Sequence, residues 1–359
     1  MTLHDYYPNH PPIYDIQKSY AENVELGPFF NGAIPKRVMP PRDKWIDFLG
    51  NSLASPLGVA AGPLLTAKWV KLAADLGFDL LTYKTIRTHK HPSHPLPNMI
   101  YVDTEGQIEK TGRALHQAKA PPKKIELLGV TNSFGMPSQS PDFLLEDIAL
   151  ANSYMREGQL LIISVVGSPQ TGHFLKDFID AAVLAKDAGA RVIEANFSCP
   201  NVDKKEGCLY MSQENVALFA SAIVKAIHPI PLILKMGLFN TKEEMQRVLL
   251  AAARAGVRGV CGINTISRAV IDDKGEPALG ASRLTSGICG GPIRNAALAF
   301  IRDLATINSK EQLGLSIMGV GGITLPEHFD LFLLAGADIA LTATGMMWDP
   351  YLAMRYHHG

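Results

Sequence analysis

The 359-residue chain has only four cysteines, at positions 199, 208, 261 and 289, and no two of them form a CxxC pair. Their spacing gives no zinc-binding pattern, and we expect no bound metal. No apolar run approaches the roughly 18 residues of a membrane span, and the N-terminal segment is polar and proline-rich, unlike a secretory signal. We therefore expect a cytoplasmic protein with reduced thiols and no membrane span.

Net charge is also absent, because 34 Lys and Arg residues balance 34 Asp and Glu residues. This balance gives no electrostatic footprint for a nucleic acid or an acidic membrane. The hydrophobic share of 47% in a chain of this length is enough for a large core. Length alone permits two domains, but a single α/β barrel with insertions fits equally well.

Residues 1–50 read as an irregular N-terminal extension, and residues 51–359 as one domain with a regular rhythm. Apolar runs predict eight strands at Leu57–Gly62, Leu80–Thr85, Leu160–Gly167, Arg191–Ser198, Pro231–Gly237, Gly259–Thr265, Leu315–Gly322 and Asp338–Gly345. Amphipathic stretches between them predict helices at Leu65–Leu76, His173–Ala188, Glu214–Ile227, Lys242–Ala255, Ile293–Ile307 and Glu327–Ala335. Eight alternating strands favour a closed (β/α)₈ TIM barrel of the α/β class. The alternative, an open doubly wound sheet, is weakened because no GxGxxG follows the first strand.

Two connections are too long for ordinary loops: residues 87–142 after the second strand and residues 266–290 after the sixth. Both leave the carboxyl ends of strands, where barrel active sites lie, and we expect lids or substrate walls. A hairpin is expected within each, at Ile100–Ile108 and at Ala269–Pro277.

Polar side chains gather at the predicted strand ends, namely Lys84, Thr85, Asn196, Ser198, Lys235, Asn264 and Thr265. Any one of them could cap a helix or satisfy a loop, but a set at equivalent positions is harder to explain in that way. A buried ammonium needs a partner. The reduced isoalloxazine of a flavin, negative near N1–C2=O, would supply one. Asparagines offer both a donor and an acceptor, which suits the amides of a pyrimidine.

Glycines mark a phosphate site after the last two strands. Gly319, Gly321 and Gly322 follow the seventh strand, and Ala343-Thr344 follow the eighth. Paired loops at these positions, with backbone N–H groups and a helix N-terminus, bind phosphate in barrels. Gly290-Gly291 precede another helix and could add a third wall. The simpler alternative for each glycine is a tight turn.

Cys199 lies just past the fourth strand, beside Pro200 and between two asparagines. An unperturbed thiol pKa of about 8.5 is close enough to neutrality for general-base work. A free cysteine is more often a small buried hydrophobe, and that reading suits Cys261 better. His89, His91 and His94 have metal-like spacing, but the intervening prolines favour an irregular loop.

Together these motifs resemble the dihydroorotate dehydrogenase family over about residues 50–352. Asn196-Phe-Ser-Cys-Pro-Asn-Val202 is similar to the catalytic loop of the class 1 form, in which the base is cysteine; class 2 has serine there. Thr131-Asn-Ser-Phe-Gly-Met-Pro137 resembles the substrate loop. Lys84-Thr85, Lys235, Asn264-Thr265 and the glycine loops match the remaining positions.

The resemblance implies FMN as cofactor and dihydroorotate as substrate, oxidised to orotate in pyrimidine biosynthesis. It implies that Cys199 removes the C5 proton while the C6 hydride goes to N5 of FMN. The implied substrate contacts are Lys84, Asn132, Gly135, Met136, Asn196, Asn201, Asn264 and Thr265. The implied FMN contacts are Ala61, Gly62, Lys84, Thr85, Asn196, Lys235, Asn264, Gly290, Gly291, Gly319, Gly321, Gly322, Ala343 and Thr344. A homodimer is expected from class 1 relatives.

The chain departs from the family pattern in places. Ala343 stands for the usual Gly, Ser138 for a common Asn, and the N-terminal extension lacks the apolar helical hairpin that would receive a quinone. The electron acceptor, a second substrate, is left open among fumarate, quinone, NAD and oxygen.

Three alternative functions remain at this level. The first is a related flavin enzyme acting on uracil or another dihydropyrimidine, although such relatives commonly have His at the position of Asn201. The second is a flavin barrel that modifies tRNA, which would need a basic face. The third is a barrel that binds FMN without catalysis, which would not need to keep Cys199, both lysines and all four asparagines.

Overall fold

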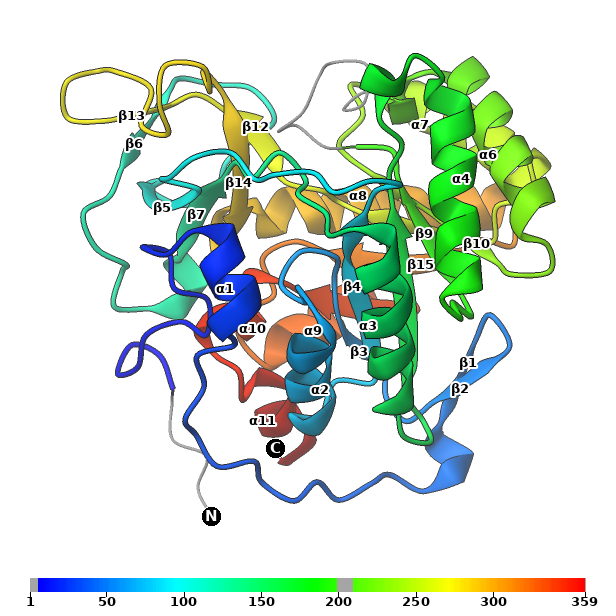
Figure 1. The fold of residues 1–359 in the computed structure, drawn as a ribbon, viewed down its shortest axis with the longest axis horizontal. Coiled ribbons are helices and arrows are strands. Elements are labelled where there is room, and N and C mark those ends of the chain that lie inside the picture. Colours follow the sequence, from blue (N-terminus) through cyan, green and yellow to red (C-terminus); the bar gives the residue numbers. More distant parts are fainter. Residues whose placement is uncertain (1–5, 199–208, 359) are drawn as a thin grey trace.

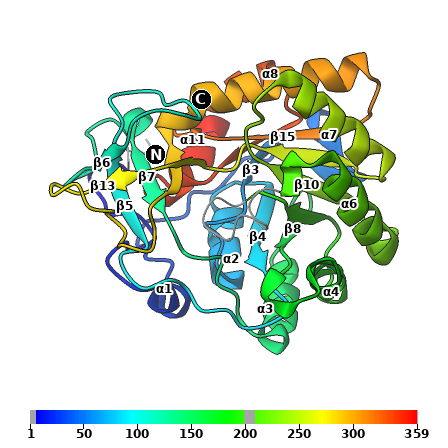
Figure 2. The same ribbon diagram turned by 90° about the horizontal axis from the view of Figure 1, so that it is seen from above.

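A closed barrel of eight parallel strands forms the centre of the computed structural model, which describes residues 6–198 and 209–358 (Figures 1 and 2). The strands follow one another in chain order, and the last pairs back onto the first. They are β3 (Leu57–Val59), β4 (Leu80–Ile86), β8 (Leu160–Val165), β9 (Ile193–Asn196), β10 (Leu232–Met236), β11 (Gly259–Gly262), β15 (Ser316–Val320) and β16 (Ile339–Thr342). Each lies within or overlaps a predicted strand, so the barrel is confirmed and the open doubly wound sheet is wrong.

Helices surround the barrel on its outside (Figure 2). They are α2 (Ala67–Asp75), α3 (Pro141–Ser153), α4 (Phe174–Asp187), α6 (Gln213–Ile227), α7 (Lys242–Arg254), α8 (Arg294–Lys310) and α9 (Glu327–Leu334), with the short α10 (Thr344–Trp348) and α11 (Leu352–His358) after the last strand. Local capping sets several starts: the Ser140 hydroxyl accepts from the Phe143 N–H, and the Thr241 hydroxyl accepts from the Glu244 N–H. All six predicted helices are confirmed, with ends that differ by a few residues.

A small hairpin closes the floor of the barrel. It consists of β1 (Ile46–Phe48) and β2 (Asn51–Leu53), and the expected domain boundary at residue 50 falls in its turn. Phe48 and Leu53 are buried in one cluster with the inward-facing side chains of the strands. Because this end of the barrel is filled with apolar side chains, a polar binding site is expected at the carboxyl ends of the strands.

The two long insertions combine into one six-stranded sheet beside the barrel mouth (Figure 1). The first supplies β5 (Met99–Asp103), β6 (Leu115–Gln117) and β7 (Gly129–Asn132), and the second supplies β12 (Ile266–Arg268), β13 (Val270–Ile271) and β14 (Ser286–Gly290). Antiparallel pairing of β14 with β7, and parallel pairing of β13 with β6, join the two. Sequence patterns predict strands but not such pairing between distant segments.

One of the two expected hairpins is wrong and the other is confirmed. The chain does turn after β5, at Glu105-Gly106, but the Ile108 N–H then donates to the Pro292 carbonyl at 2.8 Å, outside the sheet. The antiparallel partner that follows is the later strand β6. In the second insertion Ile271 and Pro277 form an antiparallel bridge, as expected for a hairpin over Ala269–Pro277.

The N-terminal extension is more ordered than its composition predicts. It contains α1 (Tyr20–Leu26), which begins with a capping box between Ser19 and Glu22. Buried Asn23 accepts from the Asp15 N–H at 2.9 Å and donates to the Asp15 carbonyl at 2.9 Å. A helix this short carries too few turns to show a helical period in the sequence.

Within the described part of the chain, none of the helices is both long and apolar enough to cross a bilayer.

Candidate functional site

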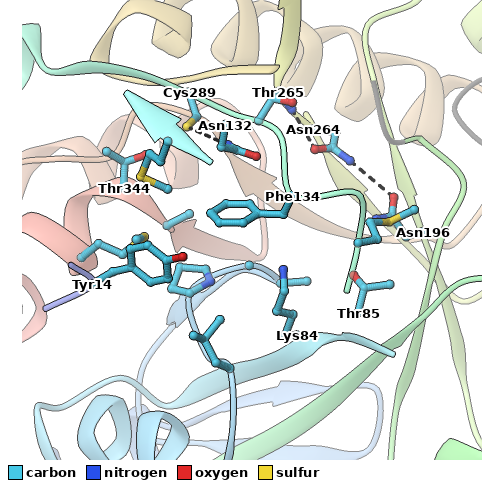
Figure 3. Close-up of a pocket in the computed structure, with 18 of the residues that line it drawn as sticks. Tyr14, Lys84, Thr85, Asn132, Phe134, Asn196, Asn264, Thr265, Cys289 and Thr344 are labelled. Atoms are coloured by element: carbon cyan, nitrogen blue, oxygen red, sulfur yellow. Dashed lines mark hydrogen bonds between the residues drawn. The ribbon is translucent and has the colours of Figure 1, made fainter. Parts of the chain in front are cut away.

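A cavity of about 940 Å³, counting its open mouth, lies at the carboxyl ends of the barrel strands (Figure 3). Three parts of the chain enclose it: the strand ends, the insertion sheet and the N-terminal extension. Its lining residues are Tyr14, Tyr20, Ala61, Gly62, Pro63, Leu65, Lys84, Thr85, Met99, Asn132, Phe134, Gly135, Met136, Asn196, Lys235, Asn264, Thr265, Cys289, Ala343, Thr344 and Met347. Most of the predicted substrate and cofactor residues are therefore brought together in one place.

An irregularity in β4 explains why two consecutive residues reach the cavity. Side chains normally alternate between the two faces of a strand. The register of β4 against β8 shifts between Tyr83 and Ile86, so Lys84 and Thr85 both line the cavity. The Thr85 hydroxyl also hydrogen-bonds with that of Ser164 at 3.0 Å.

Aromatic rings surround the ammonium group of Lys84. Its Nζ lies 5.5 Å from the ring centre of Tyr20 and 5.5 Å from that of Phe134. A cation over an aromatic face is attracted by the ring quadrupole. The two rings therefore fix this positive charge at the cavity wall, where it can meet an anionic ligand group.

Asparagines at the ends of β9 and β11, on either side of β10, are held in fixed orientations (Figure 3). Asn264 donates to the Asn196 side-chain oxygen at 3.4 Å and to the Ser198 carbonyl. Asn264 also accepts from the Thr265 N–H at 2.8 Å. The Thr265 hydroxyl is buried and has no hydrogen-bond partner among the described residues. These groups present amide and hydroxyl chemistry to a planar polar ligand.

Lys235 reaches the cavity from β10 with only 4% of its surface exposed. Its ammonium makes no ion pair or hydrogen bond within residues 6–198 and 209–358. Fully buried Glu194, which was not expected from the sequence, lies beside the Cys261 thiol in the barrel wall. Burial raises the pKa of the Cys261 thiol well above its ordinary value; Glu194 raises it further and Lys235 lowers it. Lys235 and Glu194 therefore lie near Cys261, and this cysteine is fully buried, as expected for a structural residue.

The predicted substrate loop is anchored from behind. The Arg87 side chain donates to the Met136 carbonyl at 3.1 Å, and the Arg87 N–H donates to the Ser138 hydroxyl at 3.0 Å. Gly135 has a φ of +76°, and a Cβ there would lie 2.6 Å from the His94 ring. Glycine is therefore required at 135 on two counts, and the serine at 138 has its own structural role.

Cys289 orients a predicted substrate residue. The Asn132 amide donates to the Cys289 sulfur at 3.6 Å, and the thiol donates to the Val130 carbonyl at 3.4 Å (Figure 3). Burial raises the pKa of Cys289. This neutral thiol lines the cavity, and no motif in the second insertion singled it out in the sequence.

Gly62 leaves open space in the cavity wall, called here the Gly62 cradle, which a side chain at this position would fill. Its φ is +147°, and a Cβ added there would meet no protein atom within 4 Å. A side chain at this point would project into open space, so the glycine leaves room for a ligand to approach the backbone. Ala343 has a φ of −134°, so its backbone does not need the left-handed conformation that favours glycine.

The glycine loop after β15 packs tightly against the start of α8. A Cβ at Gly321 would lie 2.7 Å from the Ala297 Cβ, and one at Gly322 would lie 2.6 Å from the Arg294 Cβ. His328 holds the end of the same loop, because its Nδ1 accepts from the Thr324 and Leu325 N–H groups at 3.2 Å. Gly321 and Gly322 are thus required for packing. Gly319, within β15, is also closely packed, because an added Cβ would lie 2.6 Å from the Phe332 ring. Contact of these glycines with phosphate stays a prediction.

Acidification should loosen this loop. Burial, and then Arg294, lower the pKa of His328 to about 4. Since the unfolded histidine titrates near 6.5, the folded protein binds fewer protons between pH 6.5 and 4. The contribution of His328 to the free energy of unfolding is fully present above pH 6.5 and is lost as the pH falls toward 4. At pH 5 this loss is about 2 kcal/mol. Urea unfolding at pH 7.5 and 5.0 should show a smaller pH-dependent loss in His328→Gln, and equal losses would contradict the assignment.

Gly290 and Gly291 do not line the cavity, and their backbone lies against the first insertion. An added Cβ would collide with the Leu128 carbonyl at Gly290 and with the Glu126 carbonyl at Gly291. We expect Gly291→Ala to lower the free energy of unfolding of the cofactor-free protein by about 1–3 kcal/mol, the usual cost of overpacking. Wild-type stability combined with weaker FMN binding would assign the glycine to the cofactor alone.

Two predicted site residues, the base Cys199 and the substrate contact Asn201, lie outside the described residues. Their roles stay predictions from the sequence.

Sequence reasoning also missed the aromatic and apolar part of the lining, including Tyr14, Tyr20 and Phe134. Phe134 lies within the recognised substrate loop, so that motif already contained a signal. The two tyrosines come from the extension, where no periodic pattern singled them out.

The cavity lining combines polar and apolar side chains. Lysine, asparagine and threonine side chains line it together with Leu65, Met99 and Met347. An isoalloxazine likewise combines a polar pyrimidine ring with an apolar dimethylbenzene ring. Together with the Gly62 cradle and buried Lys235, this makes the lining a good fit for a flavin.

Comparisons with known proteins lead to one family. A family model described as dihydroorotate dehydrogenase matches residues 116–356. A dihydroorotate dehydrogenase from Dictyostelium discoideum is 48% identical over 363 residues, covering 98% of each chain. The PreA subunit of an NAD-dependent dihydropyrimidine dehydrogenase from Escherichia coli K12 is 32% identical over 199 residues, 54% of this chain and 46% of PreA.

Among solved structures, a dihydroorotate dehydrogenase from Eimeria tenella in complex with ferulenol has a similar fold. Its TM-score is 0.70 at 16% identity, covering 90% of this chain and 85% of that one.

Proposed function

Because the chain belongs to the dihydroorotate dehydrogenase family, we propose that it oxidises dihydroorotate to orotate as an oxidoreductase acting on a CH–CH bond, with FMN as cofactor. The observation that carries the proposal is the cavity itself, which is lined by two lysines and three asparagines at strand ends and by Gly62. The near-full-length similarity to a curated dihydroorotate dehydrogenase supports it.

The residues proposed to hold FMN are those that line the cavity from the barrel side. Ala61, Gly62 and Thr85 would contact the flavin, and Lys235 would supply positive charge to its N1–C2=O edge. Ala343 and Thr344, with the loop at Gly319–Gly322, would receive the phosphate. Bound FMN supplies an acceptor for the C6 hydride of the substrate.

The remaining side chains bind and deprotonate the substrate. We propose that Asn132, Asn196, Asn201 and Asn264 hold the ring amides, with Thr265 assisting. Lys84 and the backbone at Gly135 and Met136 would receive the carboxylate, and the aromatic rings around Lys84 keep its charge in place. Cys199 would take the C5 proton, a task that contributes about 10²–10⁴-fold in enzymes.

A flavin enzyme acting on uracil-type dihydropyrimidines remains the second candidate, favoured by the partial similarity to PreA. Such a substrate lacks the carboxylate that Lys84 is proposed to bind. The two candidates therefore differ at a defined wall of the cavity.

Anaerobic mixing with substrate separates these functions. The purified protein should be yellow, and dihydroorotate should bleach the flavin absorbance. Bleaching by dihydrouracil but not by dihydroorotate would overturn the proposal. A colourless protein that binds no added FMN would overturn the cofactor assignment as well.

Further proposals concern the second substrate, the location and the assembly. Once bleached, the protein should be screened with fumarate, a quinone, NAD and oxygen as oxidants. We propose a cytoplasmic location on the basis of the composition and a homodimer on the basis of the class 1 resemblance. Sedimentation of the purified protein tests the latter.

A further inference from the structure

Tyr14 brings a hydroxyl group from the N-terminal extension to the cavity (Figure 3). The residue is 2% exposed, and its hydroxyl has no hydrogen-bond partner among the described residues. Burial raises the pKa of Tyr14 well above its ordinary value. The group is therefore a protonated donor near neutral pH.

The ring is held in a fixed position by packing and by the backbone on either side. It meets the edge of Phe134 at 5.8 Å between centroids and lies 6.2 Å from the Trp69 ring. The Ile13 N–H donates to the Met347 carbonyl at 2.9 Å, and the Asp15 N–H donates to Asn23. Since both neighbours of Tyr14 are tied down, the direction of its hydroxyl is set before any ligand binds.

An unpaired hydroxyl in this position is costly. Leaving a buried polar group without a partner costs about 1–3 kcal/mol. Phenylalanine would pack equally well against Phe134 and Trp69 without that cost. The other cavity-lining side chain with a buried, unpartnered polar atom is Thr265, which already belongs to the proposed substrate contacts.

We propose that Tyr14 is a ligand-binding residue, whose O–H donates to an oxygen acceptor of a molecule bound in the cavity. The acceptor is a carbonyl or carboxylate oxygen, and it belongs either to the orotate-type substrate or to the flavin ring. The inference rests on the proposed function. On this proposal the N-terminal extension contributes to ligand specificity as well as enclosing the cavity.

The test is Tyr14→Phe in the full-length protein, with two separate binding measurements. FMN affinity is measured by flavin fluorescence on apoprotein, and orotate affinity by the absorbance change of the holoprotein. We expect about 10-fold weaker binding of one ligand, as for loss of one hydrogen bond to a partly charged acceptor. Weaker orotate binding alone assigns the acceptor to the substrate, and weaker FMN binding alone assigns it to the cofactor.

Thermal unfolding of the ligand-free protein distinguishes a ligand-binding role of the Tyr14 hydroxyl from a structural one. Removing an unpaired hydroxyl should leave Tm unchanged or raise it, whereas removing a structural hydrogen bond should lower it. The matched control is Tyr356→Phe, because that hydroxyl bonds Asp330 on the outside of the barrel. Both affinities of the control should stay at wild-type values.

The inference is overturned if both affinities of Tyr14→Phe stay within twofold of wild type, or if both fall together with Tm. Failure of the proposed function looks different. In that case the wild-type protein itself fails to bind orotate, while its FMN affinity still reports on Tyr14.

Discussion

Replacement of Cys199 by alanine should give a yellow protein whose flavin is bleached by dihydroorotate about 10²–10⁴-fold more slowly than in wild type. The reason is that C5 deprotonation loses its base, and a positioned base contributes this factor. FMN and orotate affinities should change little, because neither task is assigned to the thiol. Anaerobic stopped-flow absorbance measures the rate, and equilibrium titration measures the affinities.

Cys261→Ala provides the matched control for that experiment. Cys261 is fully buried in the barrel wall, and burial keeps its thiol protonated. Its loss should lower stability as a small cavity does, without slowing bleaching. A Cys199→Ala variant as fast as wild type would remove this residue from the mechanism, whatever the control shows.

Lys235→Met should produce the second large effect. The ammonium is 4% exposed, reaches the cavity and has no described partner, so its charge is available to a ligand. Loss of one preorganised donor in a site that excludes water typically costs about 10²–10³-fold in rate. We expect bleaching by dihydroorotate to slow by this factor. The flavin midpoint potential should fall by about 30–60 mV, equivalent to about 1.4–2.8 kcal/mol for two electrons.

Spectroelectrochemical titration of the holoprotein measures the potential. Lys242→Met is the control, because Lys242 is an exposed lysine paired with Asp303 outside the cavity. Its potential should match wild type. An unchanged potential in Lys235→Met, with FMN still bound, would place the ammonium away from the flavin.

Much of the barrel could be predicted because each element follows from a local pattern. Apolar runs that end in polar residues predict parallel strands, and the closed fold then brings Lys84, Asn196, Lys235 and Asn264 to one mouth. Their proximity follows from the rule that the carboxyl ends of parallel barrel strands lie on the same side.

The rest of the site depends on contacts between segments that are distant in sequence. Asn132 obtains its orientation from Cys289, which lies 157 residues later. Tyr14 comes from an extension without periodicity, and buried Glu194 looks like any other residue of its strand. Such features are set by tertiary packing, which the local sequence does not encode.

The pairing of β7 with β14 also has a consequence for biosynthesis. The strand that carries Asn132 is completed early, but its partner strand is translated only after most of the barrel. Contacts of such high sequence separation form late and slowly, because a long loop must be closed first. A nascent chain that ends before residue 286 would have the cofactor lysines but an incomplete substrate wall. Binding of orotate should therefore be acquired only near the end of synthesis, as a property of the finished chain.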